Sequence, residues 1–368
     1  QSGLVRGIEA TAYYDVTISN SGDVSATSYS GGSAQAIRAI ATYGYADITT
    51  SGELSATSTF SNAIGIVSIG FYGSSVSNSG DISAESYTGF AAGMYLYSRL
   101  GESYVDSSGD INASSDFGPA YGITAIGGSG AEVNSSGDIT ATSTYNLAYG
   151  INTYAYSGDS TINNSGNVSA TAYYDATGLR AKALYGYASI DNSGDISVES
   201  QDGIGYGLYA TAYGSNAYIT NSGDISANSY SDSSAIVALA LNDAVIDNSG
   251  NLTVYSYDGD ANGIVALTSN GNVNVENSGD IDVESYYGTA IGIYARTSNG
   301  GEISIANDGD ISVYSGSLQA FGIFAFNYYG GDVTVNNSGD ISVEGQSFEA
   351  GIFAITPDSI TIINDGSI

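Results

Sequence analysis

A four-residue motif, Asn-Ser-Gly-Asp, recurs along the whole chain and divides it into about thirteen repeats of 27–30 residues. The glycine of the motif aligns the repeats and is called the anchor below. Intervals between anchors differ by at most three residues, which indicates small loop insertions in a constant register. Such a period predicts stacked, equivalent structural units. The anchors are Gly22, Gly52, Gly80, Gly109, Gly137, Gly166, Gly194, Gly223, Gly250, Gly279, Gly309, Gly339 and Gly366.

Aliphatic residues flank every anchor at fixed distances. Four residues before it stands Ile or Val, as in Ile18, and two residues after it stands Ile, Val or Leu, as in Val24. This alternation with Ser and Thr indicates strands with one buried face. A further strand lies mid-repeat in Gly-Ile-x-Ala. We predict that its inward column consists of Ile8, Ile37, Ile66, Met94, Ile123, Ile151, Leu179, Leu208, Val237, Ile264, Ile293, Ile323 and Ile352.

Each repeat therefore predicts three short strands, and no repeat can bury its own aliphatic stripe. We predict an all-β fold: a single parallel β-helix, or β-solenoid, over residues 1–368, with three strands per coil and about 13 coils. Successive coils would lie about 4.8 Å apart, so that like side chains stack. β-Propellers need longer repeats, and leucine-rich repeats place Leu and Asn at other spacings, so neither fits.

The anchor corner has two further expected properties. Glycine is expected there because it tolerates the positive φ of a sharp turn. Asn stands two residues before most anchors, as in Asn192 and Asn221, and Thr or Ser stands before the others. A stacked Asn column predicts amide hydrogen bonds that run from coil to coil.

Composition excludes several classes of function. The chain has 38 acidic and six basic residues, a formal charge of −32, which excludes nucleic-acid binding. It contains no His and no Cys, so the common nucleophile–base pairs and His metal sites cannot form. No apolar run approaches the roughly 20 residues that span a bilayer. We therefore predict no enzymatic activity, no resident cofactor and no membrane span.

An acidic residue follows most anchors, and stacked unit charges about 4.8 Å apart repel each other by roughly 1 kcal/mol in water. We favour full solvation of this column, because the calcium-binding repeat Gly-Gly-x-Gly-x-Asp is absent. Bound Ca²⁺ is the alternative, since it prefers carboxylate oxygens. The candidate Ca²⁺ ligands are Asp195, Asp224, Asp280, Asp310 and Asp340.

Large side chains occupy outward positions of the mid-repeat strand, beside all six basic residues. Exposed aromatic stripes mark contact surfaces, here for protein, sugar or a neighbouring filament. The alternative is that loops cover them. The residues of this lateral contact face are Tyr95, Tyr97, Tyr209, Tyr294, Phe324, Phe326 and Phe353.

The Asn-Ser-Gly-Asp-Ile-Ser-Ala blocks, such as Asn192 to Val198 and Asn221 to Ala227, resemble the repeats of autotransporter passenger domains and related surface adhesins of Gram-negative bacteria. The resemblance covers nearly the whole chain. It implies a right-handed β-helix that is secreted to the cell surface.

The sequence opens near a second strand and stops within a first strand, so two copies joined head to tail would nearly complete a coil. We therefore expect an extracellular structural protein whose subunits stack end to end into a filament, the symmetry that makes fibres. An adhesin that binds a host, sugar or cell-surface ligand is the alternative, and a polysaccharide-active enzyme a remote one. The expected self-association residues are Gly7, Ile8, Ala10, Ile18, Ile352, Ile362, Gly366 and Ile368.

Overall fold

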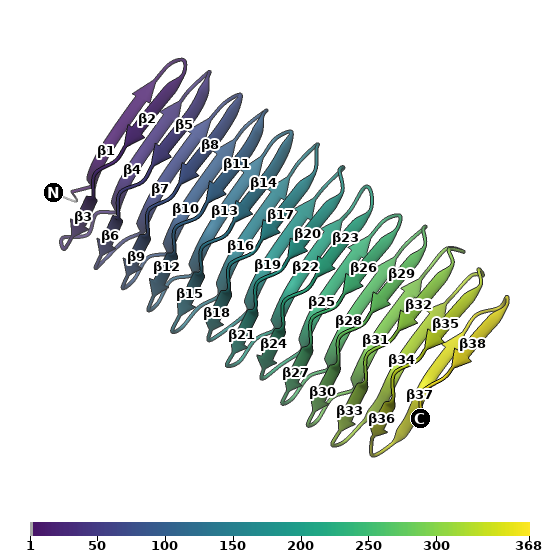
Figure 1. The fold of residues 1–368 in the computed structure, drawn as a ribbon. Coiled ribbons are helices and arrows are strands. Elements are labelled where there is room, and N and C mark those ends of the chain that lie inside the picture. The colour runs from purple at the N-terminus through teal and green to yellow at the C-terminus, as the bar shows by residue number, and fades with distance from the viewer. Residues whose placement is uncertain (1–2) are drawn as a thin grey trace. The chain divides into compact units, whose positions relative to one another are not determined.

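A computed structural model describes residues 3–368, which form strands and turns but no helix. Accordingly, no membrane-spanning helix is found in that range. The chain divides into two compact units, Gln1–Tyr185 and Gly186–Ile368, here called the first and the second unit. In each unit the strands form three parallel sheets: sheet A from the Gly-Ile-x-Ala strands, sheet B from those that end at the Asn, and sheet C from those that follow the anchor (Figure 1). The predicted all-β parallel β-solenoid with three strands per coil is confirmed, while the single domain stays a prediction.

The first unit contains strands β1 to β19. Sheet A consists of β1 (Val5–Ala12), β4 (Ala34–Ala41), β7 (Ala63–Gly70), β10 (Ala91–Ser98), β13 (Ala120–Gly127), β16 (Ala148–Ala155) and β19 (Ala176–Ala183). Sheet B consists of β2 (Val16–Asn20), β5 (Tyr45–Thr50), β8 (Gly73–Asn78), β11 (Glu102–Ser107), β14 (Gly130–Ser135) and β17 (Ser160–Asn164). Sheet C consists of β3 (Val24–Ser28), β6 (Leu54–Ser58), β9 (Ile82–Ser86), β12 (Ile111–Ser115), β15 (Ile139–Ser143) and β18 (Val168–Ala172).

The second unit contains strands β20 to β38. Sheet A consists of β22 (Gly205–Ala212), β25 (Ser233–Ala240), β28 (Ala261–Thr268), β31 (Ala290–Thr297), β34 (Gln319–Asn327) and β37 (Phe348–Ile355). Sheet B consists of β20 (Ala188–Asn192), β23 (Ala217–Asn221), β26 (Ala244–Asn248), β29 (Val273–Asn277), β32 (Ile303–Asn307), β35 (Val333–Asn337) and β38 (Ile360–Asn364). Sheet C consists of β21 (Ile196–Ser200), β24 (Ile225–Ser229), β27 (Leu252–Ser256), β30 (Ile281–Ser285), β33 (Ile311–Ser315) and β36 (Ile341–Glu344).

The core of each unit is a set of aliphatic columns. In the first unit, Ile66, Met94 and Ile123 pair in register on sheet A and are fully buried. Sheet B continues the same way with Val76 and Val105. Because each such side chain contributes about 1.5–3 kcal/mol on full burial, stacking of the coils supplies the stability that one coil lacks.

One predicted core position in the second unit is wrong. Leu208 pairs with Ile236, and Ile236 pairs with Ile264, so Ile236 rather than Val237 continues the inward column. Val237 pairs with Tyr209 on the outer face. The two adjacent β-branched residues are indistinguishable in sequence, and the register of the neighbouring coils decides between them.

The expected positive φ at the anchors is also wrong. Within residues 3–368, positive φ occurs only at Gly31, Gly300, Gly330 and Gly331, none of which is an anchor. Glycine is required there because successive corners lie in contact. A Cβ added to Gly137 would lie 2.3 Å from the carbonyl oxygen of the preceding anchor, Gly109.

The predicted Asn column is confirmed, most completely in the second unit. There each Asn from Asn192 to Asn337 donates from Nδ2 to the Oδ1 of the Asn in the next coil, as from Asn248 to Asn277 and from Asn277 to Asn307, both at 2.7 Å. Nδ2 of Asn277 also donates to the carbonyl of its anchor, Gly279, at 2.7 Å. Since these side chains are buried, the column satisfies polar groups that water cannot reach.

Replacing one buried member of the column tests this role. We expect Asn277→Ala to destabilise the second unit by about 1–3 kcal/mol, because Nδ2 of Asn248 loses one of its two acceptors and Oδ1 of Asn307 loses its donor from Asn277. Asn299→Ala is the matched control, since the amide of Asn299 bonds that of Asn270 at the exposed surface. Denaturant unfolding measures both variants, and equal losses would contradict a structural column.

Candidate functional site

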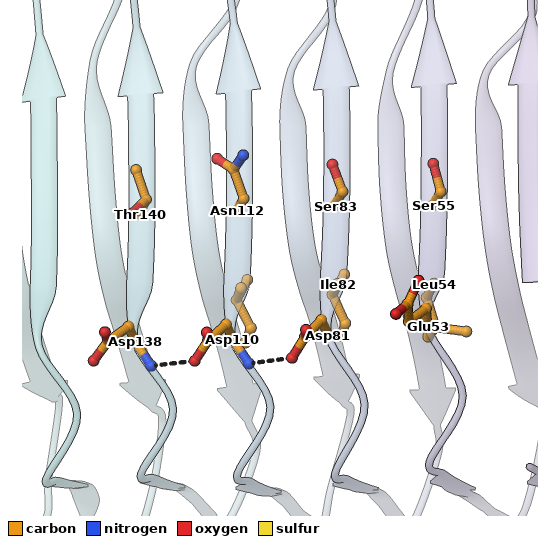
Figure 2. Close-up of a pocket in the computed structure, with 11 residues that line it drawn as sticks. Glu53, Leu54, Ser55, Asp81, Ile82, Ser83, Asp110, Asn112, Asp138 and Thr140 are labelled. Carbon is orange, nitrogen blue, oxygen red and sulfur yellow. Dashed lines mark hydrogen bonds between the residues drawn. The ribbon is translucent and has the colours of Figure 1, made fainter. Parts of the chain in front are cut away.

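The acidic column of the first unit makes regular hydrogen bonds along the edge of sheet C. Figure 2 shows Asp81, Asp110 and Asp138 side by side in successive coils. Oδ1 of Asp81 accepts the backbone N–H of Asp110 at 3.0 Å, and Oδ1 of Asp110 accepts that of Asp138 at 2.9 Å. Each carboxylate therefore closes the corner of the next coil, a role that spacing alone did not reveal.

The second unit repeats this arrangement at the predicted Ca²⁺ candidates. Oδ1 of Asp224 accepts the N–H of Asn251 at 2.8 Å, and Oδ1 of Asn251 accepts that of Asp280 at 3.1 Å. The bonds continue from Asp280 to Asp310 and from Asp310 to Asp340. Because an Asn amide oxygen serves as well as a carboxylate, the position requires a short side-chain acceptor rather than a charge.

The carboxylates of this column do not converge on a common point. Among residues 3–368, no group of three or more acidic side chains lies close enough to hold a metal ion. Bound Ca²⁺ therefore stays a prediction without a described ligand cluster. At Asp340, hydrogen bonds from the backbone and side chain of Ser367 lower the pKa below its usual value. That contribution to stability is present above the unfolded pKa of about 3.9 and is lost as pH falls through the lower folded value.

Beside the acidic column runs a shallow groove on the outer face of sheet C in the first unit. Its volume is about 460 Å³. Polar side chains of successive strands form its other side: Ser55, Ser83, Asn112 and Thr140 (Figure 2). The groove combines hydroxyl, amide and carboxylate groups, but it holds no basic residue and no candidate nucleophile–base pair.

Two substitutions of Asp310 distinguish its role as a hydrogen-bond acceptor from the effect of its negative charge. We expect Asp310→Asn to retain the melting temperature, because the amide Oδ1 can accept the N–H of Asp340 as Asn251 accepts that of Asp280. Asp310→Ala removes the acceptor and should lower the melting temperature by a few degrees, for a loss of about 1 kcal/mol. Calorimetry compares the two, and destabilisation by Asn as large as by Ala would show that the charge itself is needed.

The lateral contact face predicted from sequence lies on the outer face of sheet A. In the first unit Tyr95 and Tyr97 project from β10 and are half-buried. Tyr95 packs with Ile64, Val67 and Ala92, together with the partly buried Tyr121. Burial raises the pKa of Tyr95, so its phenol is neutral at physiological pH.

In the second unit the predicted residues form one column. Tyr294 stacks on Phe324 with ring centroids 5.3 Å apart, and Phe324 contacts Phe353 at 5.5 Å. Tyr209 continues this column through Val237 and Val265. Phe326 lies beside Phe324, at 6.4 Å. Phe321 also belongs to this surface: it is buried and contacts Phe324 at 5.0 Å. The repeat pattern did not reveal it, because it precedes the Gly-Ile-x-Ala core of the strand.

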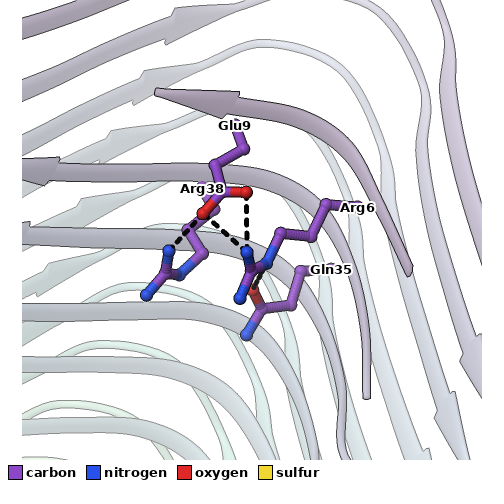
Figure 3. Close-up of polar contacts among 4 residues, drawn as sticks. All are labelled: Arg6, Glu9, Gln35 and Arg38. Atoms are coloured by element: carbon purple, nitrogen blue, oxygen red, sulfur yellow. Dashed lines mark hydrogen bonds and ion pairs between the residues drawn. The ribbon is translucent and has the colours of Figure 1, made fainter. Parts of the chain in front are cut away.

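Basic side chains on the same sheet are engaged locally. Figure 3 shows Glu9 between Arg6 and Arg38, with Arg6 also donating to Gln35 at 3.3 Å. The Arg6 hydrogen bonds are the largest cause that lowers the pKa of Glu9. Arg99 lies over the ring of Phe71, 5.3 Å from its centroid. These cations therefore stabilise the sheet surface and do not form a patch that would attract anions.

The predicted self-association residues differ in exposure. In the first unit Ile18 is buried, Ile8 and Ala10 are half-buried, and Gly7 is exposed. In the second unit Ile352 and Gly366 are half-buried, while Ile362 and Ile368 are exposed by 45% and 67%. Ile362 continues the inward column of Val335.

Tyrosine ladders at the corner after sheet C were not anticipated, because loop residues gave no periodic signal. In the first unit Phe117 stacks on Tyr145, with centroids 5.0 Å apart and planes 15° apart. In the second unit Tyr257 contacts Tyr230 at 5.2 Å and stacks on Tyr286 at 5.4 Å. Equivalent turns bring these rings into register from coil to coil.

Stacked three-strand coils with polar corner columns define a repeat protein of the β-helix class. Residues 180–368 match the model of a family described as the BigA third pectate lyase-like domain. The match covers 189 of the 368 residues, just over half, and the chain belongs to this family. It supports a β-helix family of surface proteins. No curated protein and no solved structure was found to match the chain.

Proposed function

We propose that this chain is a non-enzymatic β-helix scaffold of a secreted cell-surface protein of adhesin type, comparable to an autotransporter passenger domain. Its family membership supports this assignment. The observation that carries it is a difference between the positions of each coil. Inward and corner positions repeat the same residues, whereas the outer face of sheet A in the second unit carries large apolar side chains such as Tyr294, Phe324 and Phe353.

Those apolar side chains follow one another across several strands of sheet A. Besides the column of Phe324, a second outward column runs through Leu239, Leu267, Arg296, Phe326 and Ile355. Contiguous apolar surfaces with aromatic side chains are typical of protein contact sites. We assign the adhesive contact to this part of the lateral contact face.

The family description contains the term pectate lyase-like, but a polysaccharide-active enzyme is disfavoured here. Uronate polymers are anionic and need cations for binding. All six basic residues lie on or directly beside sheet A, so the groove on sheet C has none of them. The carboxylates beside sheet C accept backbone N–H groups in a regular series, without the local break that a catalytic cleft requires.

The lateral contact face predicts a measurable loss of adhesion. We expect the double variant Phe324→Ser, Phe326→Ser to lose most of the binding of the labelled chain to target cells in flow cytometry, because it removes adjacent rings from the apolar surface. The control is Tyr314→Ser, an outward aromatic on sheet C. Undiminished binding by the folded double variant would contradict this assignment.

A second candidate function is end-to-end assembly into a filament. The observation that favours it is the unbroken register of the coils, in which Ile360 and Ile362 on β38 continue the inward columns of Val333 and Val335. In such a filament, the first coil of a second copy, which contains Ile8 and Ala10, would pair its strands with those of the last coil. Neighbouring filaments or a surface ligand would then meet the outer sheets.

A charge in the inward column of β38 tests assembly. We expect Ile362→Lys to abolish oligomers in sedimentation velocity and filaments in negative-stain microscopy, because a lysine would be buried in the stacked core. Ile363→Lys is the matched control: this neighbour is similarly exposed but pairs with Asn336 in the outward column. A wild-type chain that stays monomeric at high concentration excludes the filament.

A further inference from the structure

A small pocket opens on the outer face of sheet C in the second unit, away from the lateral contact face on sheet A. Its volume is about 320 Å³, at the lower end of the roughly 300–1,000 Å³ of small-molecule sites. It lies within the part of the chain that matches the family model. Its lining residues are Glu199, Ser200, Gln201, Asn228, Ser229, Tyr230, Tyr255 and Tyr257.

The register of three coils creates the pocket. Glu199, Asn228 and Tyr255 are partners in one outward column, so two shorter side chains are followed by a bulky ring. The side chains at the adjoining corner also become larger along the stack. Gln201 stands there in the first of the three coils, and Tyr230 and Tyr257 stand there in the next two. The tyrosines therefore form a step at the end of a depression over β21 and β24.

The corner tyrosines beside this depression stack on one another from coil to coil. Tyr257 and Tyr286 are parallel within 2°, and Tyr230 is tilted by 32° from Tyr257. Tyr257 is thus flanked by rings on both sides, whereas the other side of Tyr230 faces the coil of Gln201. Desolvation, and then the charge of Glu284, raises the pKa of Tyr255. Its ring is therefore a neutral phenol with an electron-rich face.

The charge of the surroundings selects among ligands that stack on aromatic rings. Glu199 supplies a carboxylate at the pocket, and the only basic residue of the second unit is Arg296, on β31 of sheet A. Anionic ligands are repelled. A neutral sugar ring can stack on tyrosine, but only a cation gains from both the ring faces and the negative potential.

We propose that this pocket binds a methylated ammonium group, which rests on the faces of Tyr230 and Tyr255 with Glu199 as its counter-charge. Choline and trimethyl-lysine carry this group in common. The site is independent of the adhesive contact and of end-to-end assembly, so its absence would leave both proposals standing.

Ligand-observed saturation-transfer NMR on the full chain tests the proposal with choline, trimethyl-lysine amide and 3,3-dimethyl-1-butanol, the uncharged isostere of choline. We expect both ammonium probes to bind and the isostere to bind about tenfold more weakly than choline, as loss of cation–π and ionic attraction implies. The ratio of the two ammonium affinities identifies the source that the site prefers. Binding should weaken as salt is added.

Variants locate the site. Tyr255→Leu keeps apolar bulk but removes the ring, and Glu199→Gln removes the charge; each should weaken choline binding severalfold or more. Tyr314→Leu is the matched control, because Tyr314 stands in the same outward column beyond Glu284 and outside the pocket. Circular dichroism verifies that each variant is folded.

Four results would overturn the proposal, with methyl glucoside added as a neutral sugar probe. Equal affinity for choline and its isostere would show a merely apolar pocket, and binding of methyl glucoside without choline would show a sugar site. Choline binding that Tyr255→Leu leaves unchanged, or no binding of either ammonium probe, would remove the site altogether.

Discussion

Parallel stacking of coils is the interaction on which the rest of the structure depends. A coil of 27–30 residues has an aliphatic side but no core of its own, so its inward residues are buried only against the coils before and after it. This requirement fixes the same residue type at the same position in each repeat. In both units it yields continuous columns of Ile, Val, Leu and Ala.

Polar groups at the corners depend on the neighbouring coil in the same way. Strand ends leave backbone N–H and C=O groups that must find partners, and short side chains of the neighbouring coil provide them. Asn277 donates to its anchor's carbonyl and to the next Asn, and Asp310 accepts the N–H of Asp340. The anchor glycines then allow consecutive corners to approach closely. Much of the acidic character near these corners is thus architectural.

Strand number, strand order and the Asn column were predictable because they depend on period and residue type alone. Other features were not. Ile236 and Val237 have similar propensities, so only pairing with Leu208 and Ile264 settles which is inward. The role of Asp310 depends on an N–H one coil away. Tyr230 and Tyr255 are adjacent only through the stacking of different loops and strands, and their pocket has no signature in one repeat.

In the proposed function, inward and corner residues hold the coils together, and outward residues of sheet A bind the target. A saturation-mutagenesis scan of the displayed chain, scored both for protease resistance and for binding to target cells, tests this most directly. We expect inward and corner substitutions to lower both protease resistance and binding, whereas outward substitutions on sheet A should lower binding alone. A binding loss spread evenly over all faces of folded variants, or protease sensitivity caused mainly by outward positions, would contradict it.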